Sequence, residues 1–143
     1  MLGLPYYPNV GDLLIWQGSL DFLKKIKYKC LYSTSIMNFQ KPLINKDIII
    51  ILMGGGNFSD LYIGHQKFRK MILTSFPENK IIMLPQSIFY YDINNLKQDA
   101  EIFQNHNNLT LCARDKYSME ITKEYFSNSQ NILLPDMAFC IDL

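Results

Sequence analysis

The sequence DIIIILMGGGNFSDLY, residues 47–62, decides the fold. It contains a six-residue apolar run, Ile48 to Met53, whose four consecutive isoleucines are β-branched and stiff at χ1. Such a run predicts a strand that is covered on both faces. Gly54, Gly55 and Gly56 follow directly, so backbone N–H groups can approach a ligand closely or adopt positive φ. Because ligands bind at the carboxyl ends of strands in open α/β sheets, this stretch indicates a ligand site.

Helices and strands alternate along the rest of the chain. Apolar residues that recur every three to four positions predict the helices, and short β-branched runs predict the strands. We expect helices at residues 12–25, 63–76, 94–105 and 115–126, and strands at residues 29–33, 48–53, 80–84, 109–113 and 132–134. The three glycines are expected to form a turn, and Pro85 to end the strand before it. This alternation predicts an α/β fold, a single Rossmann-like lobe over residues 1–143 with a parallel sheet and helices on both faces.

Composition excludes several classes of protein. A hydrophobic content of 48% indicates a globular chain, and a net charge of +1 gives no basic excess that would indicate a nucleic-acid partner. No apolar stretch is long enough for a transmembrane segment, and the N-terminal residues do not resemble a signal peptide, so we expect a cytoplasmic protein. Cys30, Cys112 and Cys140 show no CxxC spacing and predict neither a metal site nor a disulfide. Cys30 and Cys112 lie in strand-like runs and are expected to be buried.

Polar and glycine-rich clusters follow the predicted strands. The clusters are Asn9-Val10-Gly11-Asp12, Gly54-Gly55-Gly56-Asn57, Pro85-Gln86-Ser87, Arg114-Asp115 and Pro135-Asp136. Any one of them is most simply a turn or a helix cap. In a parallel sheet, however, all five lie at the same edge, where a ligand crevice belongs. We therefore predict a ligand site at this edge.

Arg114 is the strongest candidate for an anion contact. It lies between a predicted buried strand and a helix, where a guanidinium fork suits phosphate or carboxylate. The alternative is a structural ion pair with Asp115 or Asp136. Ser118, one helical turn further on, either adds a hydroxyl to the site or points to solvent. The segment Asn9-Val10-Gly11-Asp12 opens a helix whose free N–H groups either hold an anion or form an ordinary N-cap.

The remaining polar residues carry weaker signals. Arg69 lies among lysines and is predicted to face solvent, and His106, in an asparagine-rich turn, is predicted to lie at the surface. His65 is expected at a helix start. Possible acids are Asp60, Asp92 and Asp136, but nothing pairs them, and the catalytic residue stays unknown. Gly54-x-Gly56-x-x-Ser59 nearly matches a dinucleotide motif, but the next strand ends without the expected acidic residue, which disfavours NAD.

The ordered set of motifs resembles the polysaccharide pyruvyl transferase family. The matching segments are Asn9-Val10-Gly11-Asp12 with Leu14-Ile15, Gly54 to Tyr62, Pro85-Gln86-Ser87, Arg114-Asp115 with Ser118, and Leu134 to Phe139. They occur in the family's order and span nearly the whole chain. The resemblance therefore rests on a series of motifs rather than on any single one.

The resemblance implies transfer of a pyruvyl group from phosphoenolpyruvate to two hydroxyls of a sugar in a surface or exopolysaccharide. It also implies a fold like that of two-lobed GT-B glycosyltransferases, with phosphoenolpyruvate as a donor substrate and no cofactor. The partners would be this small donor and a glycan acceptor. Substrate contacts are implied at Asn9, Gly11, Asp12, Gly54, Gly55, Gly56, Asn57, Gln86, Ser87, Arg114 and Ser118.

Two departures from the family pattern open alternatives. Only Met1 to Tyr7 precede the first motif, where the family has a full strand, and the chain ends about where the family's first lobe ends. We therefore expect an N-terminal lobe or a truncated product without the second lobe. One alternative is a glycosyltransferase lobe that uses a nucleotide sugar. Another is a non-catalytic module that pairs with a separate second lobe or forms an oligomer, as the apolar end Met137 to Leu143 hints.

Overall fold

The computed structural model describes residues 1–142. Its strands are β1 (Leu2–Leu4), β2 (Thr34–Ser35), β3 (Ile50–Leu52), β4 (Gly55–Ser59), β5 (Ile81–Phe89), β6 (Leu109–Ala113) and β7 (Gln130–Leu133). Its α-helices are α1 (Val10–Lys25), α2 (Ile63–Ser75), α3 (Ile93–Gln104) and α4 (Lys116–Tyr125), and a short 3₁₀ helix, η1 (Met137–Cys140), follows β7. None of the helices in this part of the chain is both long and apolar enough to cross a membrane.

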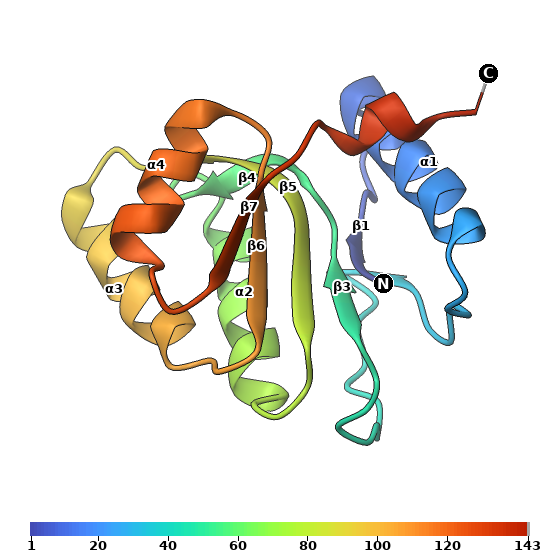
Figure 1. The fold of residues 1–143 in the computed structure, drawn as a ribbon, viewed down its shortest axis with the longest axis horizontal. Helices are drawn as coiled ribbons and strands as arrows, with labels where there is room; N and C mark the ends of the chain where they lie inside the picture. The colour runs from blue at the N-terminus through green and yellow to red at the C-terminus, as the bar shows by residue number, and fades with distance from the viewer. Residues whose placement is uncertain (143) are drawn as a thin grey trace.

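The strands form one parallel sheet in the order β2-β1-β3-β5-β6-β7, and β4 pairs with β5 outside this path. Helices α2, α3 and α4 lie on one side of the sheet, and α1 and η1 lie on the other (Figure 1). The chain is therefore an α/β, Rossmann-like lobe with helices on both faces, as the alternation of strands and helices predicts.

The main core lies between the sheet and helices α2, α3 and α4. Strand residues such as Ile81 and Met83 meet Ile72 of α2 and Phe103 of α3 there, and all four are fully buried. A smaller cluster on the other face joins Ile15 of α1 and Met137 of η1 to Met53 and Leu84. The two faces of the sheet are thus covered unequally. Three helices cover one face, whereas only α1 and the short η1 cover the other (Figure 1).

The glycine-rich stretch is not the predicted turn but the beginning of β4. Gly55 pairs with Gln86 and Phe58 with Ile88, so the chain continues alongside β5. Nor does Pro85 end a strand, because β5 runs through it to Phe89. The reason is an exchange of neighbours: β5 pairs with β3 as far as Met83 and with β4 from Gln86 onward. The proline, which has no N–H to donate, lies between the two pairings.

The strand predicted at residues 29–33 is also wrong. Only Thr34 and Ser35 form a strand there, and Cys30 is exposed rather than buried. The segment is instead held by the amino group of Met1, which donates to the carbonyl oxygen of Tyr32 at 2.6 Å. A short first strand does precede the first motif, because Leu2–Leu4 pairs with both β2 and β3.

The four helices lie within two residues of their predicted bounds. Asn9 caps α1, Asp92 caps α3 and Asp115 caps α4, each with a side-chain oxygen that accepts a backbone N–H. The capping bond of Asn9 explains why α1 begins at Val10 rather than at Asp12. The sequence pattern thus located these helix starts to within two residues.

His106 is buried, although its sequence context predicts the surface. Its Nε2 lies 3.1 Å from the carbonyl oxygen of Phe76, and its Nδ1 accepts from the backbone N–H of Asn108. Both ring nitrogens therefore bond to the backbone of neighbouring turns. The side chain joins the end of α2 to the start of β6 and serves the fold rather than a site.

Candidate functional site

The three glycines differ in what surrounds them. A methyl group at Gly54 would lie 2.5 Å from the carbonyl oxygen of Pro85, so this position needs glycine for close backbone packing. One at Gly55 would lie 3.5 Å from Oδ1 of Asp12, and one at Gly56 would lie 3.1 Å from Nη2 of Arg114. The backbone of Gly55 and Gly56 therefore separates a carboxylate from a guanidinium at the carboxyl edge of the sheet.

We predict that Gly55→Ala destabilises the fold more than Gly56→Ala does. Gly55 has a φ of +130°, which L side chains rarely adopt, so an alanine there is expected to lower the free energy of unfolding by about 2 kcal/mol. At Gly56 the methyl group meets one side-chain atom, Nη2 of Arg114, which must shift by only a few tenths of an ångström, and the change is expected to stay below about 1 kcal/mol. Urea unfolding of the two variants measures the difference, and equal losses would contradict it.

Arg114 lies in a network of polar groups on the far side of Gly56. Its Nε donates to Oγ of Ser87 at 2.7 Å, and its Nη1 donates to Oδ2 of Asp136 at 2.6 Å. Ser87 in turn donates to Oδ2 of Asp115 at 2.8 Å. The ion pair with Asp136 that the sequence left open is therefore present. The pair with Asp136 uses Nη1 and the bond to Ser87 uses Nε, so Nη2 remains, directed towards Gly56.

Asp115 fixes this network electrostatically. Burial opposes ionisation of its carboxyl, but hydrogen bonds from the N–H of Ser118 and the hydroxyl of Ser87, together with nearby Arg114, outweigh burial and lower its pKa. A carboxylate at Asp115 orients the hydroxyl of Ser87, whose oxygen is then free to accept from Arg114. The guanidinium is thereby held in one orientation before any ligand binds.

Asp12 lies on the other side of the glycines beside two aromatic side chains. Burial and a hydrogen bond with Asp12 raise the pKa of Tyr7 to about 12, so its hydroxyl stays protonated. The ring of His65 meets the ring of Tyr7 edge-on. Burial, together with the charge of Arg69, lowers the pKa of His65, which favours its neutral form. His65 does lie in the first turn of α2, as predicted, but next to these groups.

Arg69 links Asn57 to Gln86. It was predicted to face solvent, and this prediction is wrong, because the residue is only 4% exposed. The Arg69 guanidinium donates to the carbonyl oxygen and Oδ1 of Asn57, to Oε1 of Gln66 and to Oε1 of Gln86. It also lies over the ring of Phe58. Burial lowers its pKa to about 10, so it stays charged at neutral pH. Arg69 lies three residues before Ile72 on one helix face, but helical spacing alone does not predict that an arginine is buried.

Other candidates lie behind the surface or serve as caps. Gln86 is fully buried and donates from Nε2 to the carbonyl oxygen of Met53 at 2.6 Å. Ser118 is buried too, and its Oγ accepts from the N–H of Ile88, so it neither faces solvent nor reaches Arg114 directly. Asn9 uses its side chain to cap α1, beside exposed Gly11. Gln86 and Ser118 therefore support the edge from inside, whereas Asn9 and Gly11 lie at its surface.

The three possible acids, Asp60, Asp92 and Asp136, accept hydrogen bonds from the backbone or form an ion pair. Asp60 accepts from the backbone N–H groups of Tyr91 and Asp92, and Asp92 caps α3. Asp136 caps η1 and pairs with Arg114. Within residues 1–142, histidine, cysteine and carboxylate side chains form no group of three that could hold a metal ion.

The fold and this edge define a class of protein: an α/β lobe with a guanidinium, that of Arg114, and a carboxylate, that of Asp12, at the carboxyl ends of parallel strands. Such a site suits a small anionic ligand beside a polar one. A large hollow on the sheet face is lined mostly by apolar residues and lacks this chemistry.

The chain belongs to the polysaccharide pyruvyl transferase family, whose model matches residues 9–143. It is 42% identical over 137 residues to EpsO of Bacillus subtilis, covering 94% of this chain and 42% of that protein. It is 28% identical over 149 residues to pyruvyl transferase 1 of Schizosaccharomyces pombe, covering 97% and 37%. The chain thus spans less than half the length of these curated relatives.

A solved structure shares the fold. A Klebsiella pneumoniae protein of uncharacterised function superposes with a TM-score of 0.71 at 22% identity, over 100% of this chain and 51% of that chain. At this identity the likeness concerns the fold alone. It agrees with the arrangement of strands and helices described above.

Proposed function

We propose that this chain forms the donor side of a pyruvyl transferase that moves the pyruvyl group of phosphoenolpyruvate to two hydroxyls of a polysaccharide sugar. The observation that carries the proposal is Arg114, whose guanidinium is held by Ser87 and Asp136 and whose Nη2 is directed towards Gly56. Family membership supplies the reaction class. Phosphoenolpyruvate carries a phosphate and a carboxylate, the two groups that a guanidinium fork binds best.

The proposed reaction needs a group that holds the anionic donor on one side of the glycines and a group that binds the sugar hydroxyl on the other. One sugar hydroxyl adds to C2 of the enolpyruvyl group while a proton reaches the methylene carbon. The second hydroxyl then displaces phosphate at the same carbon, and its proton leaves with the phosphate or to solvent. Arg114 would hold the anionic donor, and the carboxylate of Asp12 would accept a hydrogen bond from a sugar hydroxyl. The other half of the family's proteins would complete the cleft.

The test is thermal unfolding of the purified chain with phosphoenolpyruvate and, separately, with a panel of nucleotide sugars. A ligand that binds only the folded state stabilises it by about 2.7 kcal/mol at one hundred times its Kd. We expect phosphoenolpyruvate to raise the Tm by several degrees and nucleotide sugars to leave it unchanged. A shift with nucleotide sugars alone would favour glycosyl transfer. No shift from a folded chain would refute donor binding by this chain alone.

Arg114→Ala is expected to abolish the shift with phosphoenolpyruvate. The variant also loses the pair with Asp136, which is partly exposed, so its Tm without ligand falls by an amount that corresponds to about 1 kcal/mol. Each variant is therefore compared with its own ligand-free Tm. Lys123→Ala, which removes an exposed cation from α4, is the control and should keep the full shift. A full shift in Arg114→Ala would make Arg114 a structural ion-pair residue only.

A further inference from the structure

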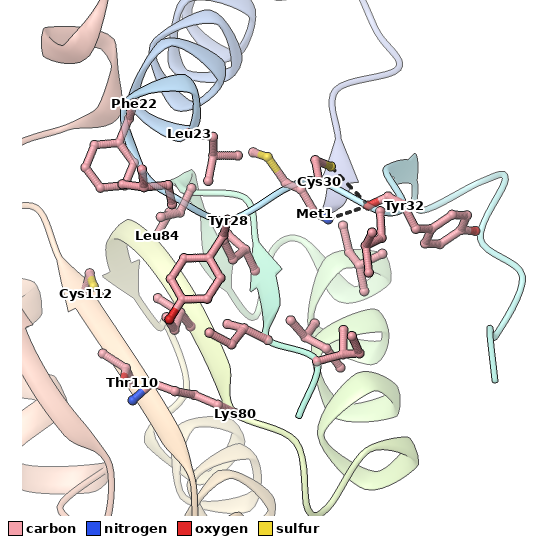
Figure 2. Close-up of a pocket in the computed structure, with 18 of the residues that line it drawn as sticks. Met1, Phe22, Leu23, Tyr28, Cys30, Tyr32, Lys80, Leu84, Thr110 and Cys112 are labelled. Carbon is pink, nitrogen blue, oxygen red and sulfur yellow. Dashed lines mark hydrogen bonds between the residues drawn. The ribbon is translucent and has the colours of Figure 1, made fainter. Parts of the chain in front are cut away.

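The sheet face opposite α2, α3 and α4 is only partly covered. Alternate strand residues point to this face and line a hollow of about 1370 Å³, which we call the sheet-face hollow. The strand residues that form its floor include Ile51, Ile82, Leu84, Thr110, Cys112 and Ile132. Figure 2 shows Leu84, Thr110 and Cys112 along this floor. Burial among these apolar groups raises the pKa of Cys112 to about 11, so the thiol stays protonated and acts as part of the apolar lining.

The end of α1 and the segment that follows it line the side of the hollow opposite the sheet. Phe22 and Leu23 reach it from the last turns of α1, and Tyr28 and Cys30 follow from the segment after that helix (Figure 2). Tyr28 remains 70% exposed although it lines the hollow. Parallel sheets are normally covered on both faces, and an apolar surface of this extent marks an interaction site. The hollow is therefore expected to bind an apolar partner.

The relatives indicate where that partner comes from. More than half of EpsO, and about half of the Klebsiella protein, lies outside the segment that this chain matches. Helices are the elements that cover parallel sheets, as α2, α3 and α4 do on the opposite face. At the margin of the hollow, Lys24 is paired with Asp21, and the remaining lysines, Lys29 and Lys80, outnumber Asp47. This balance favours carboxylates beside the apolar stripe of the partner.

We propose that the sheet-face hollow binds an amphipathic helix supplied by the half of the family's proteins that this chain does not match. The apolar stripe of the helix packs on the partly exposed Ile82 and Ile132, and acidic residues beside the stripe meet Lys29 and Lys80. The inference rests on the hollow and on the matched lengths. It does not depend on phosphoenolpyruvate as donor, so the thermal-shift experiment and the one below fail separately.

The experiment uses the purified 143-residue chain and labelled synthetic peptides that tile the part of EpsO outside the match. Fluorescence anisotropy measures binding, and light scattering measures the mass of the free chain. We expect the free chain to be monomeric and at least one peptide with a helical apolar repeat to bind one to one. Tyr28→Glu should weaken that binding at least tenfold, because it places a charge in the hollow. Added salt should weaken it further.

Tyr91→Glu is the matched control, because Tyr91 is 71% exposed and does not line the hollow. Both tyrosines are exposed, so neither substitution should impair folding, which circular dichroism checks. Tyr91→Glu should leave peptide binding unchanged. A dimer that Tyr28→Glu dissociates would overturn the proposal in favour of a second copy of this chain. A monomer that binds none of the peptides, or equal binding by both variants, would also overturn it.

Discussion

Gly18→Ala is expected to lower the free energy of unfolding by about 3 kcal/mol. Gly18 lies in α1 directly against η1, and a methyl group there would meet the backbone carbonyl oxygen of Met137 at 1.8 Å. Backbone atoms cannot rotate away as a side chain can, so η1 must move off the helix. That movement would also open the small core of Ile15, Met53, Leu84 and Met137. Urea unfolding, followed by circular dichroism, measures the loss.

Gly64→Ala is the control for this prediction. Gly64 is also helical, but a methyl group there would meet nothing within 4 Å. Alanine in an open helical position is expected to leave stability unchanged or to raise it by up to about 1 kcal/mol. If Gly18→Ala proved as stable as Gly64→Ala, the contact between α1 and η1 would not be a tight one in solution.

Arg69→Met is expected to cost about 3 kcal/mol of stability and to abolish the thermal shift with phosphoenolpyruvate. The substitution keeps a long apolar side chain but removes the donors to Asn57, Gln66 and Gln86. Buried acceptors left without a donor cost about 1–3 kcal/mol each before the structure relaxes. Because Arg69 anchors Asn57 directly after Gly56, the glycine backbone beside Arg114 would also lose its fixed position.

Lys67→Met is the matched control, because Lys67 is exposed on the same helix. Its change in unfolding free energy should stay within about 0.5 kcal/mol. Arg69→Lys keeps the charge but not the planar fork, so it should recover only part of the lost stability. Stability within 0.5 kcal/mol of the parent chain for Arg69→Met would show that the network makes no net contribution to folding.

Local patterns predicted most of the fold. The change between twofold and helical periodicity located the four helices and the strands at residues 48–53, 80–84, 109–113 and 132–134, each at least in part. At the glycines and at Pro85 the prediction failed because two strands, β3 and β4, pair with the same strand, β5. The register of β4 on β5 depends on where β5 leaves β3, and no local pattern around Gly55 or Pro85 records that exchange.

The candidate site was predicted in outline and corrected in detail. The sequence alone brought Asp12, Gly56 and Arg114 to one edge, because parallel strands end together. It could not choose between ligand contact and ion pair for Arg114. The ion pair depends on Asp136, which lies 22 residues further along the chain and reaches the guanidinium only after β7 has paired with β6.

The four helices, the strands at residues 48–53, 80–84, 109–113 and 132–134, and the family therefore follow from the sequence by itself, since each depends on neighbours within a few residues or on an ordered set of motifs. The tertiary structure alone decided that Arg69 and His106 are buried, that Ser118 bonds to the backbone of β5, and that one sheet face stays open. The physical reason is that burial and hydrogen-bond partners depend on which distant segments pack together. The guanidinium of Arg69, for example, donates to oxygens of Asn57 and Gln86, which lie on different strands.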